Sequence, residues 1–231
     1  MKGILYQLLG LALTAITGIR LEGGDLVLSV RPRKGRGLRC PECGRRCARY
    51  DAGRGARRWR ALDLASAKCF LEYAPRRVSC PEHGVRVEAV PWAPDPRSRF
   101  TGAFEDRVAW LAARCDTSTV AELMRVDRHA AGGICARAEA RLEAARGSSR
   151  LDGPRGIGID ETGCTRGHDH LAVVVDRGRG CAVRCAKGRG RATPGSPFEL
   201  PGPGRCAAVE VATRGGAGRI ADVMAERCPA A

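Results

Sequence analysis

Cys40-Pro41-Glu42-Cys43-Gly44 and Cys80-Pro81-Glu82-His83-Gly84 are the stretches of this sequence that decide its fold. Each places two soft metal ligands on one tight turn, and its final glycine tolerates the left-handed backbone that such a turn requires. The 36 residues between Cys43 and Cys80 leave room for two such turns to meet and complete one tetrahedral site. We therefore predict a zinc ribbon whose structural Zn²⁺ ion is held by Cys40, Cys43, Cys80 and His83.

Two alternatives to this ligand set stay open from the sequence. Cys47 closely follows the first turn and offers a thiol that can take the place of His83. The cysteines can also be buried thiols without a metal, because Cys47 and Cys69 show that cysteine occurs here outside the paired turns. The matching proline and glycine offsets of the two turns favour the zinc site.

The composition indicates a folded protein with a polyanionic partner. The 231 residues are 44% hydrophobic, which permits real cores and excludes a disordered tail. Lysine and arginine number 40 against 25 acidic residues, and the net charge of +15 favours double-stranded DNA over a membrane surface. The twelve cysteines are not spaced as in a small secreted disulfide scaffold, so we expect a reducing, cytoplasmic setting.

The N-terminal apolar stretch Ile4–Ile19 has two interpretations. It superficially resembles a signal peptide, because Lys2 precedes it. Polar residues interrupt it, so it is too short and too polar for a convincing membrane span. We prefer a local helix or strand that packs on the first domain, and we expect no association with a membrane.

The first domain is expected over residues 1–92 and is mostly β. Ile19–Leu21 and Leu26–Val30 flank the pair Gly23-Gly24 and predict a hairpin. Arg57–Leu64 and Cys69–Tyr73 alternate like strands, and they are predicted to be the strands of the zinc ribbon.

Residues 31–60 carry most of the net charge, with twelve basic residues against only Glu42 and Asp51. A cluster near the end of this block is a candidate for contacts with DNA phosphates, the alternative being a solvated charged face. The cluster consists of Arg57, Arg58 and Arg60.

The proline-rich residues 91–99 predict a domain boundary, and a helical domain is expected over 100–147. Apolar residues spaced four, three and four apart from Phe104 to Cys115 predict a first helix. Thr119–Glu122 has the form of a capping box and predicts the start of a second helix, which runs through Met124. A third helix is predicted from the apolar positions Ile134, Ala138 and Leu142.

A short helix, a tight junction near Arg125–Asp127 and a longer basic helix predict a helix-turn-helix. In this motif the last helix lies in the major groove of DNA, with its N-terminal residues near base edges. The alternative is an ordinary helical linker with a charged face, since Gly132-Gly133 weakens the last helix. The residues predicted to contact DNA are Arg125, Arg128, His129 and Arg137.

The third domain is expected over residues 155–231. Gly156–Glu161 is an apolar segment that ends in acidic residues, and Leu171–Asp176 is a second apolar run. The two predict neighbouring buried strands with carboxylates at the tip of the first, where Asp160 is a candidate metal ligand. The further predicted elements are strands over Cys181–Ala186 and Cys206–Ala212 and a helix over Ala217–Arg227.

Taken in order, these parts resemble bacterial insertion-sequence transposases of the ISL3 type. The likeness rests on the two ligand turns, on GIDE at Gly158–Glu161 and on HLAVVVD at His170–Asp176. Further matching stretches are RRWRALDL, VPWA, FEDRVAWLA, TSTVAELMRV, Gly167-His168, RCAAVE and RIADVMAERCP. The resemblance implies an α+β multidomain protein with a zinc ribbon, a helix-turn-helix and the first half of a ribonuclease-H-like α/β core of the DDE type.

The resemblance also implies a chemistry, in which three carboxylates hold two Mg²⁺ ions for cleavage and strand transfer at terminal inverted repeats. Asp160 matches the first carboxylate. The second is expected where this sequence has Thr213-Arg214-Gly215-Gly216, and the third belongs to a segment beyond Ala231. We therefore expect a truncated copy that binds the repeats and that is catalytically inactive because it does not hold Mg²⁺ productively. A homodimer is compatible with this binding.

Two other functions stay open, namely a strand transferase completed by a separate C-terminal half and a zinc-dependent DNA-binding regulator. Other acidic residues of the third domain are not expected to replace the missing carboxylates, because their positions are typical of turns, loops and strand surfaces. These residues are Asp169, Asp176 and Glu210. His168 and His170 are expected to be loop and strand-edge residues without a metal.

Overall fold

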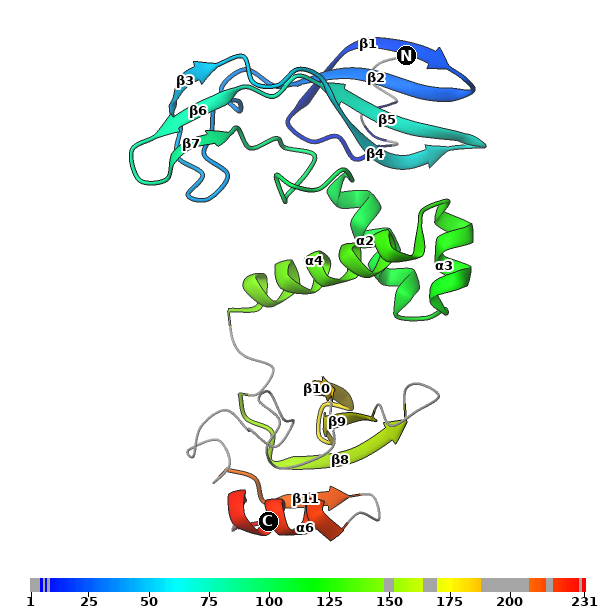
Figure 1. The fold of residues 1–231 in the computed structure, drawn as a ribbon, viewed down its shortest axis with the longest axis vertical. Coiled ribbons are helices and arrows are strands. Elements are labelled where there is room, and N and C mark those ends of the chain that lie inside the picture. The colour runs from blue at the N-terminus through cyan, green and yellow to red at the C-terminus, as the bar shows by residue number, and fades with distance from the viewer. Residues whose placement is uncertain are drawn as a thin grey trace. The chain divides into compact units, whose positions relative to one another are not determined.

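The computed structural model describes Leu5, Gln7 and residues 9–147, 152–163, 170–187, 208–214, 218–228 and 230–231 (Figure 1). The chain divides into two compact units, Met1–Leu142 and Glu143–Ala231. The first unit contains two small sheets and three helices, and the second contains one sheet and one helix among the described residues.

The larger sheet of the first unit has the order β1-β2-β5-β4. The predicted hairpin is confirmed, because β1 and β2 are antiparallel and Glu22 pairs with Asp25 around Gly23-Gly24. Both glycines have positive φ, 59° and 85°, as a two-residue type I′ turn requires. β5 pairs in parallel with β2 and antiparallel with β4. The strand bounds are Thr14–Glu22 for β1, Asp25–Pro32 for β2, Arg57–Leu64 for β4 and Ala67–Tyr73 for β5.

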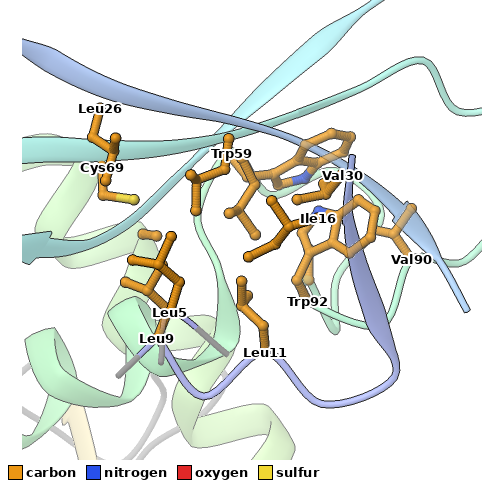
Figure 2. Packing of buried hydrophobic residues seen from close by; sticks show 14 residues of the cluster. Leu5, Leu9, Leu11, Ile16, Leu26, Val30, Trp59, Cys69, Val90 and Trp92 are labelled. Carbon is orange, nitrogen blue, oxygen red and sulfur yellow. The ribbon is translucent and has the colours of Figure 1, made fainter. Parts of the chain in front are cut away.

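One face of this sheet carries the main apolar core of the first unit (Figure 2). Trp59, Leu28 and Leu71 are each at most 1% exposed in its centre. Leu5, Leu9 and Leu11 close the core from the N-terminal stretch, so the expectation that this stretch packs on the first domain is confirmed. Large apolar side chains from distant parts of the sequence thus hold the sheet together.

The second ligand turn, residues 80–84, joins β6 and β7 of a second sheet of order β3-β6-β7. The first ligand turn, residues 40–44, precedes β3 and is closed by a bridge between Arg39 and Arg46. The strands of this sheet are short and antiparallel, with bounds Ala48–Asp51, Arg77–Cys80 and Gly84–Val87. Arg57–Leu64 and Cys69–Tyr73 are strands as predicted, but their assignment to the ribbon sheet was wrong. They are β4 and β5, and their buried Trp59 and Leu71 complete the apolar face of the β1-β2 hairpin instead.

Glu88 joins the two sheets. Its carboxylate, 1% exposed, accepts hydrogen bonds from the Tyr73 hydroxyl at 2.8 Å and from the Leu38 amide at 2.7 Å. The Arg76 amide and guanidinium donate to it as well, at 2.9 to 3.1 Å. Burial alone would raise the pKa of Glu88, but the hydrogen bonds from Arg76, Leu38 and Tyr73 outweigh it and lower that pKa. The carboxylate is therefore held ionised between β5 and the first ligand turn.

The proline-rich residues 91–99 do not form an open linker. Trp92 is 5% exposed and packs edge-on against Trp59 and Tyr73, with ring centroids 5.6 and 5.5 Å away. The Arg60 amide of β4 donates to the Arg99 carbonyl at 2.8 Å, and the Thr101 amide donates to the Arg60 carbonyl at 2.9 Å. This segment thus lies against the free edge of β4 and leads directly into the first helix.

The three predicted helices are present as α2 (Gly102–Ala112), α3 (Thr117–Met124) and α4 (Arg128–Arg146). The predicted capping box at Thr119 is wrong, because α3 begins earlier. Its N-cap is Asp116, whose carboxylate accepts hydrogen bonds from the amides of Ser118 and Thr119. The hydrogen bonds from Thr119, with those from Ser118, lower the pKa of Asp116 to about 2.

A small core holds the helices together. Phe104, Val108, Val120, Ala131 and Ile134 are buried in it. The predicted apolar face of the third helix is correct at Ile134 and Ala138 but wrong at Leu142, which is 66% exposed. α4 extends beyond the other two helices there, so its last turns have no apolar partner among the described residues.

Glu105 of α2 is a fully buried carboxylate inside the helical part. Its oxygens accept from the Ser98 hydroxyl at 2.7 Å, from Arg137 Nε at 2.7 Å and from Arg141 Nη1 at 2.5 Å. Two guanidinium groups of α4 thus neutralise one carboxylate of α2, and Ser98 ties the preceding segment to the same group.

The second unit contains a sheet of order β10-β9-β8-β11. The first three strands are antiparallel neighbours, and β11 runs parallel to β8. The predicted fourth strand, residues 206–212, is corrected to Val211–Arg214, while residues 206 and 207 lie outside the described residues. The other bounds are Gly156–Gly163 for β8, His170–Asp176 for β9, Cys181–Lys187 for β10 and Gly218–Arg227 for α6.

Removal of the Glu105 carboxylate should destabilise the first unit. In Glu105→Ala, the half-buried guanidinium of Arg137 loses its ion-pair partner and that of Arg141 keeps only the exposed Asp106, and we expect a loss of about 3 kcal/mol in the free energy of unfolding. Urea unfolding followed by tryptophan fluorescence measures this loss, since Trp59, Trp92 and Trp110 all lie in this unit. The control is Asp106→Ala, which removes a 70% exposed partner of Arg141 and should cost below about 1 kcal/mol. Equal losses would show that burial of Glu105 contributes nothing.

Candidate metal centre and nucleic-acid interface

The side chains of the two ligand turns converge on one point. The ligand atoms of Cys40, Cys43, Cys80 and His83 all lie within 4.8 Å of one another. Cys43 Sγ is 3.8 Å from Cys80 Sγ, while His83 Nδ1 is 3.6 Å from Cys80 Sγ and 3.8 Å from Cys40 Sγ. The four predicted zinc ligands are therefore brought together.

These separations fit a Zn²⁺ ion. Zinc bonds of about 2.3 Å to sulfur and about 2.05 Å to nitrogen place tetrahedral sulfurs about 3.8 Å apart and sulfur about 3.6 Å from nitrogen. The donor set of three thiols and one imidazole is also one that structural zinc sites use. We conclude that the turns can hold zinc with little rearrangement.

The backbone explains why the ligands converge. Gly44 and Gly84 have the same φ of 68°, so each turn closes through a left-handed glycine at the same offset. In the first turn the Gly44 amide donates to the Cys40 carbonyl at 3.0 Å, and the Cys40 amide donates to the Arg45 carbonyl at 2.9 Å. In the second, Cys80 pairs with Gly84 at the end of the β6-β7 ladder. Both turns thus present their ligands through the same backbone geometry.

The electrostatics favour ionised sulfur at one ligand. The hydrogen bond with the His83 side chain lowers the pKa of the Cys80 thiol to about 6. Burial raises the pKa of the neighbouring Cys47 thiol, which is not one of the four converging ligands. The open choice between Cys47 and His83 is thus settled for His83 in the geometry of this structure.

The helix-turn-helix is formed by α3, a short turn and α4. The turn closes α3 with the Arg125 amide on the Glu122 carbonyl and the Val126 amide on the Ala121 carbonyl. Arg125 adopts the left-handed conformation, with φ 52°, at a position where glycine is usual. The Asp127 carboxylate then accepts from the His129 amide at 2.8 Å and starts α4.

Arg125 and Arg60 share one carboxylate, that of Asp63 on β4. Arg125 donates to Asp63 Oδ2 and, at 3.0 Å, to the Ser66 carbonyl. Arg60 donates to Asp63 Oδ1 at 2.5 Å, is 6% exposed and packs over the rings of Phe70 and Phe104. The two arginines thus hold the turn between α3 and α4 against the sheet.

Three further arginines predicted to contact DNA also have partners within the protein. Arg137 pairs with Glu105, and Arg58 pairs with Glu22 and Glu72. Arg57 donates to the Pro96 carbonyl at 3.3 Å and lies 5.0 Å from the Trp59 ring centroid. Arg125, Arg128 and His129 are exposed, and the last two lie at the start of α4. Arg125 pairs with Asp63, and Arg128 donates to the Ser118 hydroxyl at the start of α3.

Asp160 lies on β8 in the second unit, exposed and opposite Val173 of β9. On the other side of β8, Thr213 of β11 is opposite Gly158 and Arg214 is opposite Ile159. Asp160, Thr213 and Arg214 line one pocket together with Gly158, Ile159, Val173 and Val175. The residues at the expected place of the second carboxylate therefore do lie beside Asp160, and those described there are a hydroxyl and a guanidinium.

The other acidic residues considered for this site have different roles. Asp176, 3% exposed, accepts from the amides of Gly178 and Arg179 and so fixes the turn between β9 and β10. Glu210 precedes β11 rather than lying within a strand, and it pairs with Arg155 at 3.2 Å. His168 and Asp169 lie outside the described residues, and His170 begins β9.

Sequence reasoning missed the residues that position the site. Asp63 follows Arg60 at a spacing of three, which on a regular strand places the two side chains on opposite faces. The register shift between Ala61 and Leu64 accompanies their contact, and nothing local indicates this shift or the contact with Arg125. Glu105 is a charged residue on a helix that is otherwise regular, and only its position one residue after the buried Phe104 hints at burial. Both carboxylates act through partners distant in the sequence.

Removal of a zinc ligand should release the ion. We expect about one zinc per chain in the purified protein and about none in Cys40→Ser, with a lower unfolding midpoint for the first unit because metal binding and folding are coupled. Metal analysis after gel filtration measures the stoichiometry. Cys115→Ser is the matched control, an exposed cysteine between α2 and α3, and should keep its zinc. A protein without stoichiometric zinc, or a Cys40→Ser variant that keeps it, would contradict the site.

Comparison with known proteins connects this geometry to a family. Residues 36–83 match the zinc-finger of transposase IS204/IS1001/IS1096/IS1165, and residues 88–138 match the helix-turn-helix domain of transposase family ISL3. No solved structure gives a significant match. Among the described residues no helix is both long and apolar enough to span a bilayer.

Curated relatives extend the similarity beyond these two domains. The chain is 43% identical over 208 residues to the transposase for insertion sequence element IS1557 from Mycobacterium tuberculosis, in strains CDC 1551 / Oshkosh and ATCC 25618 / H37Rv. The match covers 90% of this chain and 46% of each relative, so the chain spans about half the length of the proteins it matches. All four zinc ligands fall within the first matched segment, and α2, α3 and the first half of α4 fall within the second. The chain thus matches the zinc ribbon and the helix-turn-helix domain of ISL3 transposases, and it is similar over most of its length to about half of an insertion-sequence transposase.

Proposed function

We propose that this chain binds double-stranded DNA at the terminal inverted repeats of an insertion sequence, through α4 and the zinc ribbon. The observation that carries the proposal is the exposed start of α4, where Arg128 and His129 lie beside the start of α3. In a helix-turn-helix this is the end of the recognition helix that approaches base edges. The net charge of +15 supplies the attraction to phosphate that such binding requires.

The arginines first considered for DNA contact then divide into two groups. The guanidinium groups of Arg60 and Arg125 pair with Asp63, and that of Arg137 pairs with Glu105. We therefore assign these three arginines to positioning α4. Arg57 and Arg58 are half-exposed and also have partners in the protein, which leaves them at most a contact with phosphate. Arg128 and His129 are the residues we assign to base recognition.

Two further features belong to the proposal. Inverted repeats present two copies of one site, so a homodimer would match their symmetry. A DNA-binding role also places the chain in the cytoplasm, and the cysteines of the described residues are free thiols, as a reducing compartment maintains them.

For the second unit we propose the opening half of a ribonuclease-H-like core. Three antiparallel strands, a fourth strand parallel to the first and a following helix support this assignment. Asp160 then corresponds to the first metal-binding carboxylate. Arg214 lines the same pocket, and Arg177 donates to the Thr213 hydroxyl at 3.0 Å, so guanidinium groups lie where a second carboxylate would be needed.

These residues do not fit a pair of Mg²⁺ ions. One carboxylate cannot bind two divalent cations, and neighbouring positive charge opposes their binding. We therefore propose that the chain by itself binds DNA without cleaving it. The placement of Asp160 beside β11 favours one second candidate, a strand transferase to which a separate polypeptide supplies the remaining carboxylates.

Substitution of the exposed start of α4 should weaken sequence-specific binding. For Arg128→Ala and His129→Ala we expect losses of about 1–3 kcal/mol in binding free energy, about 5- to 150-fold in Kd, for the terminal repeat relative to a scrambled duplex. Fluorescence anisotropy at fixed salt measures both affinities. Arg107→Ala, an exposed arginine on α2, removes the same charge and should lower the affinity for both duplexes only slightly. An equal loss in all three variants would mean that α4 does not read the sequence.

The cleavage proposal has a direct test. The purified chain should leave a terminal-repeat duplex intact in Mg²⁺ or Mn²⁺, as measured by denaturing gel electrophoresis of end-labelled DNA. Metal-dependent nicking that Asp160→Asn abolishes would show that the chain is an active nuclease. Nicking that survives Asp160→Asn would indicate a contaminant.

A further inference from the structure

We propose that the basic turn, residues 31–36 with the sequence Arg-Pro-Arg-Lys-Gly-Arg, inserts into the minor groove of double-stranded DNA and prefers A·T base pairs there. The turn begins at the end of β2 and precedes the first ligand turn. The inference rests on the proposed binding of duplex DNA, and it adds a contact of a different kind from that of α4.

The cations of the basic turn differ from the arginines of β4 and α4, because most of them have no partner within the protein. Arg31, Lys34 and Arg36 are exposed, and none of these side chains makes a hydrogen bond or an ion pair among the residues that the structure describes. Residues 31–41 contain five basic residues and no acidic one. The positive charge of this turn is therefore available to a polyanion.

A β-turn projects these cations from the end of the sheet. The Arg36 amide donates to the Arg33 carbonyl at 2.9 Å, and Gly35 has a φ of 82°, as the third residue of a type II turn requires. A methyl group placed on Gly35 would meet nothing within 4 Å, so the tip of the turn faces open space. Gly35 thus forms a narrow tip between two cations, Lys34 and Arg36.

Both ends of the basic turn are attached to the fold. At the first end, the Arg33 amide donates to the Leu13 carbonyl at 2.8 Å. Just after the second end, a methyl group on Gly37 would lie 2.8 Å from Arg76 Nη2 and 3.3 Å from Glu88 Oε2. Gly37 therefore lets the chain pass close to the buried ion pair of Arg76 and Glu88, and the tip is presented from a packed base.

The shape and the charge of the basic turn fit the minor groove. This groove is about 6 Å wide, which is too narrow for a helix but wide enough for extended backbone and for arginine and lysine side chains. Its negative potential is strongest where A·T pairs narrow it, so cations inserted there gain most. At G·C pairs the amino group of guanine occupies the floor of the groove. A preference for A·T pairs follows.

Inosine separates the two grooves and provides the test. An I·C pair has the phosphates and the major-groove edge of a G·C pair, but it lacks the amino group of guanine in the minor groove. Fluorescence anisotropy at one salt concentration compares short duplexes of alternating A·T, I·C or G·C pairs. We expect the wild-type chain to bind the A·T and I·C duplexes about 10-fold more tightly than the G·C duplex.

Variants assign this preference to the basic turn. The double variant Lys34→Ala with Arg36→Ala should bind all three duplexes within about twofold of one another. The double variant Arg54→Ala with Arg107→Ala removes two charges at other exposed positions, so it should weaken all three complexes alike and keep the preference. Arg128→Ala should also keep the preference, because it alters α4 alone.

The outcomes separate this contact from the proposed function. Equal affinity of the wild-type chain for I·C and G·C duplexes, with binding of the terminal repeat that depends on Arg128, would overturn the minor-groove contact and leave the proposed function standing. A preference that survives in the double variant Lys34→Ala with Arg36→Ala would overturn it as well, because another segment would then read the minor groove. A chain that binds none of these duplexes would overturn both proposals.

Discussion

The carboxylate of Asp63 is the group on which the arrangement of the first unit depends. One of its oxygens binds the buried Arg60 of the same strand, and the other binds Arg125 in the turn of the helix-turn-helix. A left-handed arginine costs about 1 kcal/mol relative to glycine, and the bonds to Asp63 and Ser66 offset that cost. The turn therefore carries a side chain that glycine could not supply. Together with Glu105, this pair fixes α4 to the sheet, and the exposed start of α4 acquires a defined position.

The zinc site compensates for the small size of the ribbon sheet. Its strands have four residues each, and Val78 and two metal ligands, Cys40 and Cys80, are the large contributors to its buried interior. So little apolar surface cannot hold three short strands together, and a bound ion supplies the missing free energy. Glu88 then connects this metal-dependent part to the sheet whose core rests on Trp59 and Trp92. A bound ion thus stabilises the ribbon and an apolar core stabilises the larger sheet, and the Glu88 carboxylate joins the two.

Local chemistry made part of this structure predictable from the sequence. The zinc ligands follow from residue types and glycine offsets, and the β1-β2 hairpin follows from Gly23-Gly24, because both depend on a few adjacent residues. The parallel pairing of β5 with β2 and the packing of Trp92 depend on complementary surfaces far apart in the chain, which no local pattern encodes. The same reason explains why Arg60 and Arg137, which resemble surface charges in the sequence, are taken up by Asp63 and Glu105. The capping-box pattern at Thr119 predicts too late a start for α3, because the Asp116 carboxylate accepts from the amides of Ser118 and Thr119 and begins the helix earlier.

If the chain binds DNA through the ribbon and α4, as proposed, the packed segment between β4 and α2 has a consequence for that DNA. Two DNA-contacting regions joined by a flexible linker can change their relative orientation to match the helical phase of the target. In this chain the backbone pairing of Arg60 with Arg99 and Thr101 restricts that change. The duplex must then supply the adjustment by twisting or bending, and the energy of that deformation depends on its base steps. Base pairs lying between the ribbon and α4, touched by neither, would still influence affinity through their stiffness. Under the proposed function, discrimination among target sites would thus extend into spacer DNA that carries no contact at all.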